Sequence, residues 1–425
     1  MVCKLNVGQD NTSISNMRIR VASLVIIITA ILMSTKYSFG YGKTWLGKKL
    51  ERQARNASFS LGPFRTTVQF LLSNTGYDTS VYYGATDEPV KDYTFTAGPA
   101  FNVYLPLKKK IIFHVYESPQ YVYFYETERE RTWNNYFTGE VYFVFNRFVA
   151  SAGIGRSEAK QRWNTETDIP ISRKEDSAQG FLLWQPAART SFNFGYRMAR
   201  YDYGESYLEG FSFADKLNRD ETYFNFTAYR EVSPRTRLFL DAEYGVFDFA
   251  NALINKNSKS YGGYGGLEFS PFGKIKGSVK VGYKSFDSLN PQRKDYRGIV
   301  GDSSVSVRLL RALTARASYR RDIQFSVWYD NTYFLESRYG AGASLYISRN
   351  IRLDYDYNRG RNDYPQEFGI QKRRDDYQIH AVGVYFRLRK DTAFGIIASR
   401  WVRDSNLDWE DDNRNFFGFN LTYDF

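Results

Sequence analysis

The sequence predicts an all-β chain that closes into a transmembrane, antiparallel, up-and-down β-barrel of about 18 strands, with about 16 as the alternative. Three observations predict this class. The chain ends on an alternating strand, it carries an export signal near its start, and it is rich in aromatic residues while polar on average. A strand with one apolar and one polar face suits a wall between lipid and water.

The last residues alternate with a period of two, which indicates a strand with one apolar face. That face carries Phe417, Phe419, Leu421, Tyr423 and Phe425, the terminal residue. The residues between them are mostly polar or small. The pattern resembles the C-terminal signal by which the barrel-assembly machinery of the bacterial outer membrane recognises its clients. The alternative, a soluble sandwich that ends on a strand, would leave the next two features unexplained.

A secretory signal precedes the strands. Arg18 and Arg20 stand before an uncharged apolar run at 21–33, and small residues follow at Ser38 and Gly40. A basic start, an apolar centre and small residues at the end are the three parts of a cleavable signal peptide. The apolar run is too short for a good membrane-spanning helix. We expect cleavage after Gly40.

These features divide the chain into three parts. We expect translation to start at Met17, so that 1–40 holds an upstream extension and the signal peptide. Cys3, the single cysteine, lies in that extension, so the exported protein would form no disulfide and do no thiol chemistry. Residues 41–62 would form a periplasmic N-terminal segment, expected to be a mobile terminus, with a short helix or a segment tucked into the lumen as the alternatives, and 63–425 the barrel. The barrel leaves no room for a plug domain.

The composition agrees with a barrel. Aromatic residues make up 18% of the chain, with 35 Tyr and 34 Phe, yet the mean hydropathy is −0.51. Outside the signal, no apolar run approaches the length of a membrane helix. Strands with alternating faces and aromatic girdles at two interfaces give these averages.

Period-two segments recur along the whole chain. The expected strands are 63–73, 92–105, 110–126, 134–147, 148–163, 176–187, 188–203, 220–232, 235–250, 258–271, 272–288, 297–311, 312–326, 330–347, 350–362, 374–389, 392–406 and 413–425. Short turns, as at 233–235, 348–350 and 389–391, alternate with long loops. The long loops are expected at 74–91, 164–175, 204–219, 289–296 and 363–373. In outer-membrane barrels the short turns are periplasmic.

The charged face of each strand must point into the lumen, because a charge facing lipid at mid-membrane costs about 2–4 kcal/mol. Most strands phase cleanly under this rule. The segment 374–389 does not, because Ile379 and Ala381 conflict with Val382 and Val384. We expect a β-bulge there.

Inward positions on the strands of 272–347 form a basic arc. It consists of Lys276, Lys280, Lys284, Arg308, Arg316, Arg320 and Arg338. In a chain of net charge +12, such an arc along a wet pore favours anionic solutes. The alternative is a solvated wall, with arginines at the rim binding phosphates of lipopolysaccharide. Nucleic acid is not an expected partner at this location.

The sequence offers little for catalysis and no expected cofactor or metal site. Its two histidines, His114 and His380, would need a Ser or a carboxylate beside them at a rim. Inward carboxylates two residues apart, Asp241 with Glu243 and 354 with 356, are close enough for glycoside hydrolysis. They more often neutralise neighbouring basic residues, and we expect that role. The glycines of 262–266 lack the spacing of a nucleotide-binding loop.

The C-terminal part has a recognisable texture. It includes 349–357 (RNIRLDYDY), 373–377 (RRDDY), 403–406 (RDSN) and 413–418 (NRNFFG). From about Tyr346 the chain resembles the putative beta-barrel porin 2 family, and it is similar to barrels found with exopolysaccharide gene clusters. The resemblance implies an outer-membrane barrel of a Gram-negative bacterium, in some members with a suspected role in polysaccharide export. It implies no catalytic residues.

Two functions follow as hypotheses, and an enzyme is not expected. The first is a porin-like channel for passive passage of polar or anionic solutes. The second is a structural or conduit component of exopolysaccharide export. A barrel enzyme acting on lipid or glycan would be a third. Expected partners are outer-membrane lipid, lipopolysaccharide, the barrel-assembly machinery, and an anionic solute or polysaccharide.

Overall fold

The barrel is seen in a computed structural model. It describes residues 45–83, 89–107, 110–167, 169–204, 207–208, 211–270, 273–328, 330–368 and 371–425. The predicted upstream extension and signal peptide, 1–40, lie outside the described residues. Residues Lys43–Phe425 form one compact unit, the barrel with its N-terminal segment.

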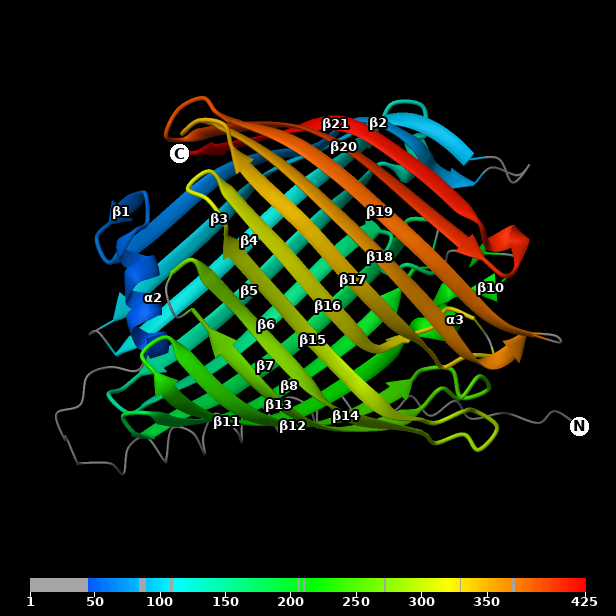
Figure 1. The fold of residues 1–425 in the computed structure, drawn as a ribbon, viewed down its shortest axis with the longest axis horizontal. Helices are drawn as coiled ribbons and strands as arrows, with labels where there is room; N and C mark the ends of the chain where they lie inside the picture. The colour runs from blue at the N-terminus through cyan, green and yellow to red at the C-terminus, as the bar shows by residue number, and fades with distance from the viewer. Residues whose placement is uncertain are drawn as a thin grey trace, which may run out of the picture. The chain divides into compact units, whose positions relative to one another are not determined.

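A single antiparallel sheet makes up the wall (Figure 1). Its strands are β2 (Phe64–Tyr83), β3 (Pro89–Leu107), β4 (Ile111–Phe124), β5 (Thr132–Val144), β6 (Phe148–Gln161), β7 (Ile171–Ala187), β8 (Thr190–Tyr203), β11 (Arg219–Ser233), β12 (Thr236–Phe249), β13 (Ser258–Phe269), β14 (Ile275–Ser288), β15 (Tyr296–Arg308), β16 (Leu313–Phe325), β17 (Tyr333–Tyr346), β18 (Ile351–Phe368), β19 (Gln371–Arg387), β20 (Thr392–Ser405) and β21 (Asp412–Asp424). Each strand pairs with the next, and β21 pairs with β2. The predicted closed barrel of 18 strands is confirmed.

The smaller elements lie at the two rims. They are α2 (Trp45–Arg55), β1 (Phe59–Leu61), β9 (Tyr207–Leu208), β10 (Phe211–Ser212), α3 (Phe213–Leu217) and the 3₁₀ turns η1 (Glu128–Glu130) and η2 (Asp408–Glu410). In Figure 1 the C-terminus and α2 lie at one end of the barrel, and α3 and β10 at the other. Among the described residues, the helices are all too short or too polar to cross a membrane.

Short turns alternate with longer connections, as predicted, but two expected loops were wrong. Residues 74–91 and 363–373 are largely strand, because β2 continues to Tyr83 and β18 and β19 extend beyond the expected ends. In β2 a register shift near Asn74, whose φ is 50°, breaks the alternation that marks a strand. In β18 and β19 the end of the hairpin is polar on both faces, so period two carries no signal there.

Side chains on the two faces of the wall differ as the phasing predicts. Outward positions carry exposed apolar and aromatic side chains, such as Leu240, Tyr283 and Tyr339, which are 69%, 54% and 59% exposed. Their sequence neighbours point inward and are polar or charged. An apolar exterior around a polar interior is the arrangement that lipid on one side and water on the other require.

The predicted bulge in β19 was wrong. Its register with β20 runs without interruption from Asp375 to Arg387, so Ile379 and Ala381 point inward. Ile379 lines an internal cavity together with Ile397 and Trp401 of β20. This part of the inner wall is therefore apolar. The alternation rule failed because it assumes that every inward position faces water.

The N-terminal segment packs on the barrel, so the short-helix alternative describes it. Leu46, Leu50 and Ala54, spaced four residues apart, lie on one face of α2. They contact Tyr104 and Tyr142, which point inward from β3 and β5. Helix α2 therefore lies against the inner wall near the short-turn rim, and β1 pairs with the start of β2.

Candidate functional site

A row of small polar residues crosses the inner wall of five neighbouring strands. The register places Ser278 beside Ser304, Ser304 beside Ser318, Ser318 beside Gly340, and Gly340 beside Asn358. We call these five residues the serine shelf. Ser278 Oγ and Ser304 Oγ are 3.4 Å apart, and the hydroxyls of Ser304 and Ser318 are open to the lumen.

Two charged rows flank the serine shelf. The row toward the short-turn rim is Lys276, Ser306, Arg316, Gly342 and Asp356, each the register partner of the next. The row toward the long-loop rim is Lys280, Asp302, Arg320 and Arg338. Because residues two apart on a strand share a face, all three rows point into the lumen.

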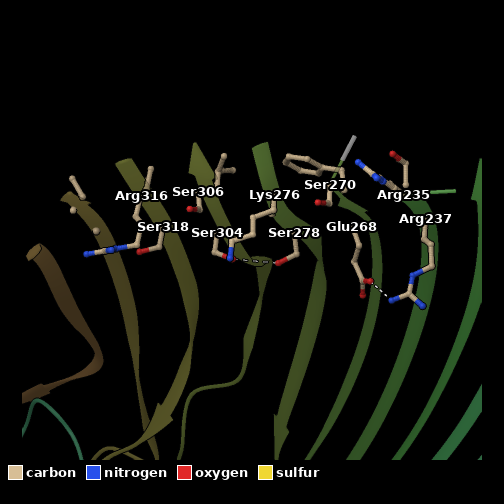
Figure 2. A pocket seen from close by; sticks show the side chains of 18 of the residues that line it. Arg235, Arg237, Glu268, Ser270, Lys276, Ser278, Ser304, Ser306, Arg316 and Ser318 are labelled. Atoms are coloured by element: carbon tan, nitrogen blue, oxygen red, sulfur yellow. Dashed lines mark hydrogen bonds and ion pairs between the residues drawn. The ribbon is translucent and has the colours of Figure 1, made fainter. Parts of the chain in front are cut away.

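The shelf and the row nearer the short turns form the wall of a cavity of about 910 Å³. Figure 2 shows Arg316 and Ser318 at one end of this wall and the ion pair of Arg237 with Glu268 at the other, with Ser304, Lys276 and Ser278 between them. This volume falls within the range of roughly 300–1,000 Å³ that is typical of small-molecule sites. A second cavity of about 520 Å³, which includes Lys280 and Arg320, adjoins it.

Three members of the predicted basic arc carry carboxylate partners. Lys280 Nζ lies 2.7 Å from Asp241 Oδ2 and 2.6 Å from Glu243 Oε1. Lys284 Nζ is 2.6 Å from Asp322, and Arg316 is 2.9 Å from Asp356. The arc is therefore interleaved with acids on β12, β16 and β18, and its positive potential is lower than the count of basic residues suggests.

The other four members stand apart from carboxylates. Among the described residues, Lys276, Arg308, Arg320 and Arg338 have no carboxylate within ion-pair distance. Lys276 lines the larger cavity and Arg320 the smaller one, whereas Arg308 is exposed near the short-turn rim. Arg338 lies beside Arg320 in the register. The structure thus places free cations on both sides of the serine shelf.

The inward carboxylate pairs neutralise basic neighbours, as expected. Asp241 and Glu243 share Lys280, and Asp354 pairs with Arg352 at 3.0 Å. Asp356 accepts from Arg316. These ion pairs join side chains on one inner face, so each of these carboxylates is held by a basic neighbour.

Two loops of the long-loop rim meet inside the barrel. The loop after β6 carries Glu166, and the loop after β16 carries Ser326 and Val327. Ser326 Oγ donates to Glu166 Oε1 at 2.6 Å, and the backbone N–H of Val327 donates to Oε2 at 2.7 Å. Lys256, from the loop after β12, donates to the carbonyl oxygens of Ser326 and Trp328 at 2.8 Å each. We call this assembly the loop bridge.

The loop bridge spans the lumen. Val327 follows β16 in the chain, yet it packs with Tyr201 and Tyr203 of β8 and with Leu217 of α3. Arg403 of β20 donates to the carbonyl oxygens of Thr165 and Glu166 at 3.1 and 3.2 Å. A cavity of about 580 Å³ remains between the loop after β6 and the wall of β2–β5 and β19–β21.

Burial dominates the electrostatics of the loop bridge. It raises the pKa of Glu166 above its ordinary value, although Arg373, Ser326 and the Val327 N–H act in the opposite direction. Burial likewise holds the pKa of Lys256 well below its ordinary value, and the positive charge of Arg293 adds to the effect. The bridge therefore favours the uncharged form of each group.

The two histidines lie on opposite faces of the barrel wall. His114 points inward, with Nε2 3.2 Å from Asn102 Oδ1 and Nδ1 3.5 Å from Glu140 Oε2. Both ring nitrogens are thus occupied, and the ring stacks on Tyr104. His380 points outward and contacts the hydroxyl of Tyr355 at 2.9 Å. Within the described part of the chain, acidic, His and Cys side chains nowhere gather in a group that could hold a metal ion.

The sequence analysis missed the serine shelf and the loop bridge. Small polar residues carry no charge or apolar signal, so only the strand register shows that the three serines adjoin. The bridge joins loops that are 160 residues apart in the chain, and no local pattern marks Glu166 as a buried residue.

Comparison with known proteins agrees with the β-barrel fold. A family profile described as putative beta-barrel porin 2 matches residues 175–425, which is more than half of the chain. The chain belongs to this family. The resemblance that the sequence from about Tyr346 suggested is confirmed. A search of curated proteins finds no match.

Solved porin structures align with this beta-barrel porin 2 member over most of its length. A BenF-like porin from Pseudomonas fluorescens Pf-5 aligns with a TM-score of 0.50 at 8% identity, over 86% of this chain and 99% of that one. OccK3 (OpdO) from Pseudomonas aeruginosa aligns with a TM-score of 0.49 at 11% identity, over 88% and 99%. OccAB4 from Acinetobacter baumannii aligns with a TM-score of 0.48 at 12% identity, over 85% and 98%. At such identities the likeness concerns the fold alone.

Proposed function

We propose that this protein is a porin-like channel of the outer membrane of a Gram-negative bacterium, through which small polar solutes pass passively. The observation that carries the proposal is the wall itself. It is a closed barrel with an apolar exterior and an interior lined by hydroxyls, amides and ion pairs around a cavity of about 910 Å³. Membership of a porin family supports it.

The proposed orientation puts the short turns and both ends of the barrel-forming chain in the periplasm, and the long loops outside the cell. Outer-membrane barrels have this layout, with short periplasmic turns and longer extracellular loops. The loop bridge then constricts the extracellular mouth, and the serine shelf faces solutes in the periplasmic half. Helix α2 narrows the periplasmic opening on the side of β3–β6.

The proposed selectivity is a weak preference for anions. Three of the seven basic residues in the arc are paired with acids, and Lys276, Arg308, Arg320 and Arg338 supply the surplus positive charge. Screening acts over about 8 Å at physiological ionic strength, so the preference should show best in dilute electrolyte. This proposal keeps the direction of the sequence-based prediction and lowers its expected size.

Single-channel recording in planar bilayers tests the proposal. Purified, folded protein should insert and give discrete conductance steps, with a reversal potential on the anion side in a salt gradient. A folded barrel that inserts without conducting would contradict passive passage.

The loop bridge favours a second candidate, a conduit or structural component of exopolysaccharide export. A mouth spanned by buried hydrogen bonds suits a path that opens for a particular substrate or partner better than one that stays open. The same recordings separate the two functions. Steady conductance of the isolated protein supports the porin, whereas a silent barrel that conducts only after the bridge is broken supports a gated conduit.

Lipopolysaccharide is the lipid partner that we propose for the outer surface. Arg359 and Arg400 point outward near the long-loop rim, beside His380, and Arg400 is the register partner of this histidine. Both arginines are exposed. Arginine is well suited to phosphate groups because its fork of N–H donors matches their oxygens.

A further inference from the structure

We infer that the serine shelf is a binding site for hydroxylated carboxylates, the chemical class of the sugar acids. The inference deepens the proposed function, on which it rests, because the shelf lies in the proposed solute path. It assigns a ligand class to five residues that are neither charged nor apolar and that line the cavity of about 910 Å³: Ser278, Ser304, Ser318, Gly340 and Asn358.

The shelf matches vicinal hydroxyl groups. Each serine hydroxyl is both donor and acceptor, and the Asn358 amide supplies two donors and an acceptor. Ladder neighbours in a sheet lie about 5 Å apart, so the three hydroxyls and the Asn358 amide lie in a line across the strands. A polyol chain can therefore exchange its water for several of these groups at once.

Glycine keeps the shelf shallow. A Cβ at Gly340 would collide with Ser318 Oγ and would lie 2.8 Å from Asn358 Oδ1. A Cβ at Gly342, in the flanking row, would collide with Asp356 Oδ1. A side chain at either position would have to displace these polar groups, whereas glycine leaves them in place and keeps the wall open where a ligand would lie along it.

The flanking rows supply the charge preference. Cations outnumber carboxylates in both rows: Lys276 and Arg316 stand against Asp356, and Lys280, Arg320 and Arg338 against Asp302. Lys276, Arg320 and Arg338 lack a carboxylate partner among the described residues. A carboxylate on a shelf-bound solute would meet an unpaired cation on either side of the row, in a site partly screened from bulk water.

The same surface discriminates against other ligands. A neutral sugar gains the hydrogen bonds but not the charge contact. An alkyl carboxylate gains the charge contact, but it leaves the shelf hydroxyls without their water partners, and unmade hydrogen bonds are unfavourable. The combination of hydroxyls and one carboxylate fits both parts of the site.

Isothermal titration calorimetry on the folded, detergent-solubilised barrel tests the inference with three probes: D-gluconate, D-glucose and hexanoate. We expect gluconate to bind most tightly. The triple variant S278A/S304A/S318A should lose about tenfold in gluconate affinity, as the loss of ordinary hydrogen bonds implies. The double variant R320Q/R338Q should weaken gluconate binding and leave glucose binding unchanged.

A matched control replaces three inward serines of the opposite wall, S151A/S177A/S191A on β6–β8, which do not line the cavity. It should bind gluconate as the wild type does. Heat-modifiable migration in gels checks that each variant is folded. Equal affinity for gluconate and hexanoate, or an unchanged affinity in the shelf variant, would overturn the inference. If the protein conducts but does not prefer gluconate, the binding site is refuted and the proposed channel function stands. If it binds gluconate but does not conduct, only the proposed passive passage of solutes is refuted.

Discussion

Glu166 and Ser326 lie on loops 160 residues apart in the chain, yet their side chains are joined by a hydrogen bond of 2.6 Å inside the barrel. The carboxylate of Glu166 also accepts from the backbone of the neighbouring Val327. This contact links the loop after β6 with the loop after β16, which start from distant parts of the wall. The strength of this contact should therefore set how wide the barrel opens at the long-loop rim.

Replacing Glu166 by alanine should open the bridge. An ordinary hydrogen bond contributes about 0.5–1.5 kcal/mol, so losing the two that Glu166 accepts should shift an opening equilibrium by roughly five- to a hundredfold. We expect larger or more frequent conductance steps in planar bilayers. Glu128→Ala, at an exposed acid of the same rim, is the matched control and should leave the recordings unchanged. Equal recordings from both variants would show that the bridge does not limit the path.

The bridge should also respond to pH. Burial raises the pKa of Glu166 above 4.5, so its contribution to closure is fully present below 4.5 and is lost as pH rises through the raised value. Acidification from neutral pH should therefore lower the open probability. Burial lowers the pKa of Lys256, so its uncharged form favours closure at alkaline pH. This contribution is lost as pH falls through the lowered pKa. In Glu166→Gln the acid response should disappear, and its persistence would assign it to another group.

Much of the fold was predictable because the membrane imposes a simple rule on each strand. An inward charge and an outward apolar residue alternate in β14 and β16, so these strands could be phased from the sequence alone. The rule failed where its cause is absent. Ile379 of β19 faces a cavity rather than open water, and the ends of β18 and β19 have no apolar face at all.

The site was less predictable because it depends on which strands adjoin and in what register. Lys280 was placed inward from its own strand, but its partners Asp241 and Glu243 lie on β12, two strands away. These two acids neutralise Lys280, so the arc is less positive than its sequence suggests. The Glu166 contact depends on how two loops fold, for which the sequence has no periodic signal.

Removing unpaired lumen cations should reverse the weak anion preference. In R320Q/R338Q two inward charges without carboxylate partners are lost, and we expect the reversal potential in dilute salt to move toward cation selectivity. The control R359Q/R400Q removes two arginines from the outward face, where they cannot act on ions in the lumen. It should leave the reversal potential unchanged. A shift of the same size in both variants would mean that the overall charge, rather than the lumen, sets selectivity.

Cysteine labelling on whole cells should report the orientation. Leu253, at the tip of the loop after β12, is 93% exposed, and Lys390 is exposed in the turn after β19. We expect an impermeant maleimide to react with Leu253→Cys on intact cells. It should react with Lys390→Cys only after the outer membrane is opened. The reverse pattern would show that the barrel has the opposite orientation. Equal labelling of both cysteines would contradict a location in the membrane.

The terminal aromatic should matter for assembly more than for stability. Phe425 is 52% exposed on the outward face, its ring packs against Tyr423, and its N–H donates to the carbonyl oxygen of Val68 at 2.9 Å. Because it lies at the short-turn rim, a charge there should cost only about 0–1 kcal/mol in the folded barrel. A marked loss of folded protein from the outer membrane in Phe425→Asp would therefore reflect poor recognition by the assembly machinery.

The matched change is Asp424→Asn, at the neighbouring inward residue, whose side chain accepts from Gln69 at 2.6 Å. This variant should assemble normally, because it leaves the outward apolar row of 417, 419, 421, 423 and 425 intact. Heat-modifiable migration of outer-membrane fractions measures the folded barrel in both. Refolding of the purified variants in detergent supplies the second comparison, since Phe425→Asp should refold there almost as well as the wild type. Wild-type levels of Phe425→Asp in the outer membrane would refute the assembly signal, and failure in detergent would make Phe425 a determinant of stability instead.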